Sequence, residues 1–85
     1  MDTTTLNTEL NAAGIPTDII NTGGGVMACR IGTYEGEFLV TPSELFDDCP
    51  DFALTLGLFD ADGEEVEMED GVSLRGAVSR IQKAL

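Results

Sequence analysis

The sequence predicts a small α+β domain in which an antiparallel sheet of four or five strands carries the N-terminal and C-terminal helices on one face. Three observations lead to this class. Apolar residues recur at helical spacing at both ends of the chain, they alternate with polar residues between those ends, and glycine-rich or acidic turns separate the alternating runs. A chain of 85 residues has room for one domain, which we expect to span residues 1–85.

The first helix is expected close to the N-terminus, where Leu6 and Leu10 recur at helical spacing after three threonines that can cap it. Its end is encoded by Gly14, Ile15 and Pro16. If Gly14 takes the left-handed position that follows a helix, Ile15 packs on Leu10 in a Schellman ending. Pro16 then prevents the helix from resuming.

Three strands are expected next. The runs at 17–22 and 26–34 flank the triple glycine 23–25, which we interpret as a hairpin connection, and the tight turn 35–36 leads into a strand at 37–41. Alternation places one set of side chains on the core face of these strands: Met27, Cys29, Ile31, Phe38 and Val40.

A short helical turn is predicted at 41–46, because Thr41, Pro42, Ser43 and Glu44 have the form of a capping box with proline at the first helical position. The run 52–59 is the clearest strand of the chain. Its leucines alternate with small residues, which predicts a central, covered position.

The last strand and helix complete the order. After a turn at 60–63, the strand 64–69 is expected to bury Val66 and Met68 and to expose the glutamates between them. Ser73 is the expected cap of the final helix, whose core stripe is Leu74, Val78, Ile81 and Leu85.

The residue types exclude several kinds of chemistry. The chain has no histidine, which removes every mechanism that needs an imidazole base, acid or metal ligand. The triple glycine is followed by a strand pattern instead of the helix that a phosphate loop requires. An EF-hand aligned on Gly63 lacks its first ligand, since Leu58 occupies that position. Adjacent acids such as Asp47 and Asp48 lack an apolar cleft that would separate their acid and base roles. We therefore expect no enzyme, no cofactor and no metal.

The two cysteines and the N-terminal residues indicate the cellular compartment. Cys29 and Cys49 lack a CxxC spacing, and residues 1–10 carry neither a basic segment nor an apolar run. We expect a cytoplasmic protein with two reduced thiols, of which Cys29 is a core side chain. No stretch approaches the roughly 20 apolar residues of a membrane span, so no membrane interaction is expected.

Charge is the feature that departs most from an ordinary small domain. Sixteen acids face four bases, for a formal charge of -12, and seven of the acids fall between Asp60 and Asp70. Strand alternation predicts that Glu65, Glu67 and Glu69 form one row with a spacing of roughly 6.6 Å, from about 3.3 Å per residue. The phosphates of one nucleic-acid strand repeat at a similar interval, roughly 7 Å. Such a row of carboxylates can stand in for phosphates.

We therefore predict a noncatalytic interaction protein, in its sharpest form a nucleic-acid mimic that occupies the basic groove of a nucleic-acid-binding protein. In size and charge the chain resembles phage-encoded anti-restriction and anti-CRISPR proteins, which implies an inhibitor, and no motif is carried over. The expected partner-binding residues are Glu64, Glu65, Glu67, Glu69 and Asp70, supported by Asp47, Asp48 and Asp51.

Two alternatives stay open at this point. The acids can serve solubility alone, as in a housekeeping domain or a halophile-type protein. A homodimer can form through the second sheet face, with contributions from Val26, Ala28, Ala53, Phe59 and Tyr34. Direct nucleic-acid binding is not expected. The order helix, three strands, helix is similar to that of double-stranded RNA-binding domains, but those domains need far more basic residues to reach phosphates.

Overall fold

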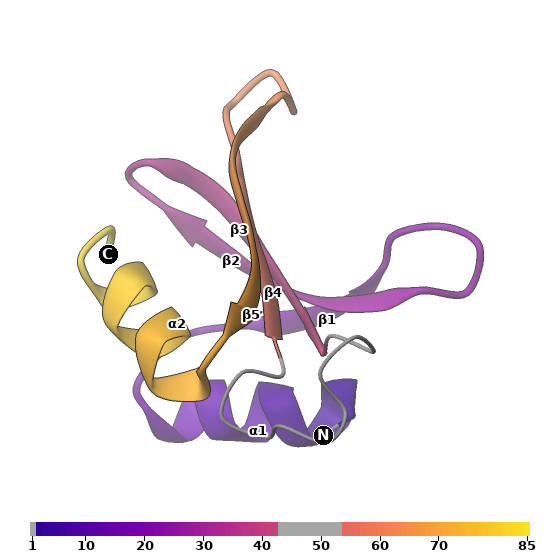
Figure 1. Cartoon of the computed structure of the whole chain (residues 1–85), viewed down its shortest axis with the longest axis vertical. Helices are drawn as coiled ribbons and strands as arrows, with labels where there is room; N and C mark the ends of the chain where they lie inside the picture. The colour runs from indigo at the N-terminus through magenta and orange to yellow at the C-terminus, as the bar shows by residue number, and fades with distance from the viewer. Residues whose placement is uncertain (1, 43–53) are drawn as a thin grey trace.

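The computed structural model describes residues 2–42 and 54–85, which form a five-stranded antiparallel sheet with one helix before it and one after it (Figure 1). The strands lie side by side in chain order, so β1 and β5 are the edges of the sheet. The α+β class expected from the sequence is confirmed. The elements in order are α1 (Thr3–Ala12), β1 (Asp18–Asn21), β2 (Met27–Thr33), β3 (Gly36–Pro42), β4 (Leu54–Phe59), β5 (Glu65–Val72) and α2 (Leu74–Gln82).

The hydrophobic core lies between the two helices and one face of the sheet. Cross-strand register brings Ile31, Phe38 and Leu58 into one row on that face, and all three are buried. Helix α1 adds Leu6 and Leu10, and α2 adds Ala77 and Ile81. Each large apolar side chain buried in this way stabilises the fold by about 1.5–3 kcal/mol. The alternation in β3 and β4, and in β2 from Cys29 onward, therefore predicted the core face correctly.

Helix α1 ends as expected but begins one residue earlier. The Ile15 amide donates to the Leu10 carbonyl and the Gly14 amide to the Asn11 carbonyl, both at 3.0 Å, which is the Schellman pattern. At the other end, the cap is Asp2, not one of the threonines. Its Oδ1 accepts a hydrogen bond of 2.7 Å from the Thr5 amide, because a carboxylate satisfies a free helix amide and also interacts favourably with the helix dipole.

Helix α2 is capped as the sequence predicts, and its buried stripe differs at one end. The Gly76 amide donates to Ser73 Oγ at 2.9 Å. Leu85, expected in the stripe, lies beyond the helix and is 43% exposed, whereas Ala77 and Ala84 are buried. Met27 was likewise expected in the core but is exposed, because it sits at the very start of β2 opposite Asn21.

The helical turn predicted at 41–46 is wrong at its first helical position. Pro42 belongs to β3, in register with Leu54 on β4. It is the last residue of its strand, where the missing amide hydrogen of proline does little harm to the ladder. The remaining residues of that predicted turn, 43–46, lie outside the described residues, as do Cys49 and the start of the strand expected at 52.

Strand β5 presents the opposite face from the one the sequence predicts. Phe59 pairs with Glu65, but the register then shifts by one residue, so that Leu58 pairs with Glu67 and Leu56 with Glu69. Such a bulge moves every following side chain to the other face. Val66 and Met68 are consequently 54% and 47% exposed, and the prediction that they fill the core is wrong. A second shift in register, before Val72, returns the following side chains to their original face, and Val72 packs against the core.

Candidate functional site

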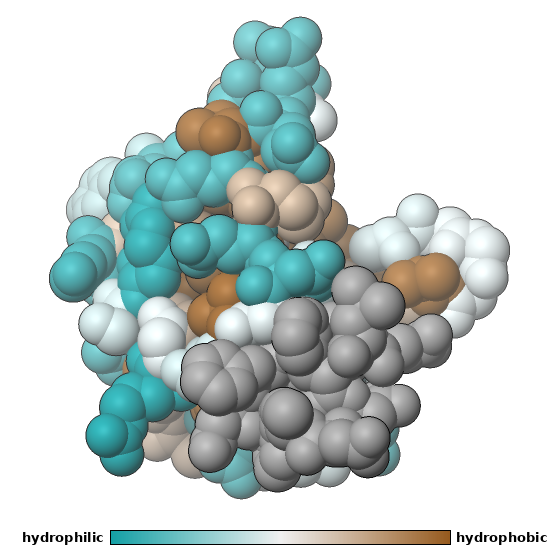
Figure 2. Space-filling model, viewed as in Figure 1, coloured by the Kyte–Doolittle hydropathy of each residue, from teal (hydrophilic) through white to brown (hydrophobic). Residues whose placement is uncertain are grey.

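Seven of the chain's acids lie on one structural unit, which we call the acidic hairpin and define as residues 60–70. It contains the β4–β5 turn and most of β5, and it projects beyond the helices (Figure 1). Every residue from 61 to 70 is exposed. Its surface is largely hydrophilic and is interrupted by hydrophobic atoms (Figure 2).

The tip of the acidic hairpin is ordered by one of its own carboxylates. Asp60 Oδ1 accepts hydrogen bonds from the amides of Asp62 and Glu64, both at 2.9 Å, and the Asp60 amide donates to the Glu64 carbonyl. Gly63 supplies the left-handed backbone, with φ of 82°, that the turn needs. The negative charges are thus carried by a defined backbone frame.

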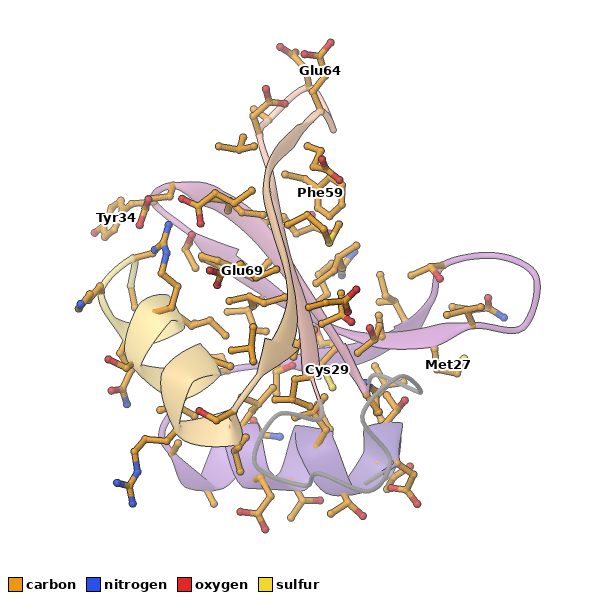
Figure 3. The ribbon with its side chains drawn as sticks, viewed as in Figure 1. Met27, Cys29, Tyr34, Phe59, Glu64 and Glu69 are labelled. Atoms are coloured by element: carbon orange, nitrogen blue, oxygen red, sulfur yellow. The ribbon has the colours of Figure 1, made fainter. Side chains whose placement is uncertain are left out.

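The carboxylates of the acidic hairpin lie on both of its sides. By register, Glu65 shares a face with Phe59, while Glu67 and Glu69 share the face that the helices cover. Figure 3 shows Phe59 and Glu69 on opposite sides of the hairpin, with Glu64 at the tip. The single row predicted for Glu65, Glu67 and Glu69 is therefore wrong, because the bulge separates Glu65 from the other two.

One acid of the acidic hairpin, Glu67, is paired with an arginine of the C-terminal helix. Arg80 on α2 donates to both carboxylate oxygens of Glu35, at 2.8 and 3.0 Å, and reaches Glu67 at 3.3 Å. Its guanidinium carbon lies 5.2 Å from the centre of the Phe38 ring, within cation–π range. The hydrogen bonds from Arg80 lower the pKa of Glu35, and the two carboxylates raise the pKa of Arg80. No local pattern signals this contact, since Glu35 and Arg80 are 45 residues apart.

The other predicted site residues divide into three groups. Asp70 is joined to β4, because the Thr55 hydroxyl donates a hydrogen bond to its Oδ1. Glu64, Glu65 and Glu69 are exposed, and no ion pair involves them within the described ranges. Asp47, Asp48 and Asp51 lie outside the described residues.

Apolar side chains lie next to these acids on the second face of the sheet. Met68 is directly opposite Gly57, and a Cβ atom added to that glycine would come within 3.0 Å of both Met68 Cε and Phe59 Cε2. Met68 and Phe59 therefore cover Gly57. Met68 and exposed Val66, both expected in the core, instead give the acidic hairpin an apolar component, and Phe59 adjoins it on the second sheet face, where it was expected.

The described residues of the expected homodimer surface do not form one patch. Val26 precedes β2 and Tyr34 follows it, so the length of that strand separates them. Val26 is 55% and Tyr34 94% exposed, but Ala28 is buried. Phe59 lies with Met68, and Ala53 lies outside the described residues.

A surface hollow of about 720 Å³ lies where the β2–β3 turn, the base of the acidic hairpin and the C-terminus meet. It is lined by an aromatic ring and carboxylates, among them Tyr34, Glu37 and Asp60, and by Leu85. These groups can receive a basic side chain through ion pairing and cation–π contact.

The cysteine of the described ranges, Cys29, belongs to the core. Burial raises the pKa of the Cys29 thiol, whose Sγ donates a weak hydrogen bond of 3.7 Å to the Thr3 carbonyl, so this cysteine is a protonated core residue. Within residues 2–42 and 54–85, no three acids or cysteines are grouped as metal ligands. Neither of the helices in these ranges has the length and apolarity needed to cross a bilayer.

Comparison with known proteins places this chain in no group. No protein-family model, no curated protein and no solved structure matches it.

Proposed function

We propose that this chain is a noncatalytic protein that binds a basic partner protein through the acidic hairpin. The proposal rests on the exposure of unpaired negative charge on an ordered hairpin. Residues 61–70 are all exposed on a projecting hairpin whose tip is ordered by Asp60, and only Glu67 among its acids pairs with a base in the described part of the chain. Unpaired carboxylates held on a fixed frame accelerate association with a basic surface and favour its binding.

More specifically, we propose that the partner is a cytoplasmic nucleic-acid-binding protein and that the acidic hairpin occupies its basic groove. Carboxylates on both sides of a narrow hairpin suit a groove with two basic walls better than a flat surface. Glu65 would face one wall, while Glu67 and Glu69, which share the helix-covered face of the sheet, would face the other. The bound hairpin would exclude nucleic acid from that groove, so the protein would act as an inhibitor. Asp47, Asp48 and Asp51 remain proposed supporting residues.

The competing hypothesis is that the acids serve only to keep the protein soluble, whether it is a housekeeping domain or a homodimeric adaptor. Charged residues on an edge strand also prevent strands of different molecules from pairing, which is a common use of such residues. The two hypotheses differ in whether the location of the charge matters or only its total amount.

The test compares two variants of equal net charge. Glu65→Gln with Glu69→Gln removes two charges from the acidic hairpin and leaves the Arg80 pair intact. Glu9→Gln with Asp18→Asn removes two charges from α1 and β1, where both residues are also exposed. Each tagged protein is used to capture proteins from a lysate of the source cells at low salt, and each captured protein is purified and tested for nucleic-acid binding.

We expect the wild type and the Glu9/Asp18 variant to retain the same nucleic-acid-binding protein and to inhibit its binding to nucleic acid. The Glu65/Glu69 variant should lose about tenfold in inhibition, since two exposed pairs of up to about 1 kcal/mol each are removed together. Equal behaviour of the two variants, or unchanged nucleic-acid binding in the presence of the wild type, would reject the proposal in favour of solubility.

A further inference from the structure

The outer edge of β5 carries an inference that rests on the proposed function and specifies how the partner is recognised. We propose that β5 accepts an extended segment of a basic protein as a sixth strand, and that basic and apolar side chains alternate in that segment. Pairing of this kind uses main-chain hydrogen bonds for affinity and alternating side chains for specificity.

The backbone of β5 has one side without a strand partner in the described chain. Strand β5 is eight residues long and pairs with β4 on one side, and no strand of the described chain pairs with its other side. Every second residue of an edge strand directs its amide and carbonyl groups away from the sheet. Six of the eight residues of β5 are exposed, so an incoming strand can reach them.

Acidic and apolar side chains alternate along this edge. On the helix-covered face, Glu67 and Glu69 are two residues apart. On the other face, Met68 lies between them in the sequence and packs with Phe59 over Gly57. An added strand alternates its side chains in the same way. Its basic residues would meet the two glutamates, and the apolar residue between them would meet Met68.

The charges select the occupant of this edge. A second copy of the chain paired through β5 would place glutamates opposite glutamates, and like charges directly across a pair of strands are destabilising. A lysine- or arginine-bearing segment meets the opposite charge. Glu67 can take part because Arg80 retains its two hydrogen bonds to Glu35, and the Glu67 side chain is half exposed.

The experiment uses the whole chain and a seven-residue peptide in which four lysines alternate with three valines. A second peptide has the same sequence with its successive backbone amides methylated, so that it keeps its charge and loses its hydrogen-bond donors. A third has the same composition with lysines and valines in separate blocks. Affinities are measured by calorimetry, and binding sites are mapped by NMR of the backbone amides.

We expect the alternating peptide to bind at least about tenfold more tightly than the methylated peptide, because several main-chain hydrogen bonds are lost in the latter. The block peptide should also bind more weakly. Amide shifts should concentrate on β5, and β1, the other edge strand, should serve as an internal control with little change. The double variant Glu67→Gln with Glu69→Gln should bind the alternating peptide more weakly than the wild type does. The double variant Glu9→Gln with Asp18→Asn should bind it as tightly as the wild type.

Three outcomes would overturn this inference. Equal binding of the alternating and methylated peptides would show that charge alone acts, which leaves the proposed function standing. If neither the alternating nor the methylated peptide binds, while the acidic hairpin still inhibits its partner in the preceding test, the added strand is rejected and the proposed function stands. Shifts confined to the surface hollow near Tyr34 would place the basic segment there instead. If the preceding test also fails, the proposed function fails with it.

Discussion

Two hairpins project from the body of this protein, and they differ in what holds them and in what they present. The glycine hairpin comprises β1, β2 and the loop 22–26 that joins them, and the acidic hairpin is residues 60–70 (Figure 1). Gly23, Gly24 and Gly25 all take positive φ, and each has open space around it. The loop is closed by the Thr22 amide bonding to the Val26 carbonyl at 2.8 Å, and it carries no charge.

The acidic hairpin needs only one left-handed glycine, and a carboxylate orders its turn through two hydrogen bonds. Its edge strand is eight residues long and exposed, whereas β1 has four residues and its two isoleucines are half-buried. The glycine loop therefore presents mainly backbone and the exposed Val26 side chain, whereas the acidic hairpin presents charged side chains. A recognition surface also needs side chains held on an ordered frame, which the acidic hairpin has.

The largest effect is expected at the base of the acidic hairpin. Gly36 has φ of 136°, and a Cβ atom there would overlap the carbonyl oxygen of Phe59, where β4 leaves the body. Gly36→Ala should lower the free energy of unfolding by about 3 kcal/mol, because strained backbone and a backbone clash combine. Urea unfolding measures this.

Gly32→Ala is the matched control, since Gly32 lies in β2 with open space at its Cβ position. It should leave stability unchanged or raise it by about 0.5–1 kcal/mol. Equal losses in the two variants would mean that the acidic hairpin does not depend on close contact with the β2–β3 turn.

An intermediate effect should distinguish the two turns directly. Asp60→Ala removes the acceptor of two hydrogen bonds and should cost about 1–2 kcal/mol, whereas Asn21→Ala removes the acceptor of one, from the Gly23 amide, and should cost about 0.5–1 kcal/mol. Thermal unfolding gives both values. Asp60→Asn retains an acceptor while removing the charge, so it should lie closer to the wild type. A greater loss of unfolding free energy for Asn21→Ala than for Asp60→Ala would show that the side chain orders the glycine loop more than the acidic turn.

The smallest effect concerns the ion pairs that tie the acidic hairpin to α2. Arg80 lowers the pKa of Glu35 below its usual 4.5, so this interaction stabilises the fold fully above about pH 4.5 and is lost as the pH falls through the lower, folded value. Arg80→Gln should therefore be less stable than the wild type at pH 7, and the difference should shrink at pH 3 and in 1 M salt.

Arg75→Gln is the control for this prediction. Arg75 lies on the same helix, is exposed, and forms no ion pair within the described residues. Its substitution should not change the pH dependence of the melting temperature. A difference between wild type and Arg80→Gln that stays constant from pH 7 to pH 3 would show that the ion pair is not its source.

Sequence patterns predicted most of the fold because most of its signals are local. The alternation of Leu54, Leu56 and Leu58 with small residues identified β4 and its buried face, and Gly14 with Ile15 identified the helix ending. For the candidate site, the sequence located the acidic run at 60–70 but not its geometry. Unbroken alternation from the pair Phe59 and Glu65 would place Val66 opposite Leu58, and the shift in register places Glu67 there instead.

The sequence by itself determined the two helices and five strands of the described residues, their order, most of the core face of the inner strands and the concentration of acids on one hairpin. These follow from side-chain size, periodicity and backbone preference within a few residues. Only the tertiary structure decided which side of the acidic hairpin each glutamate faces, and that Arg80 joins Glu35 to Glu67. Both depend on the pairing of segments distant in sequence, where a shift of one residue reverses the faces and no local pattern records it.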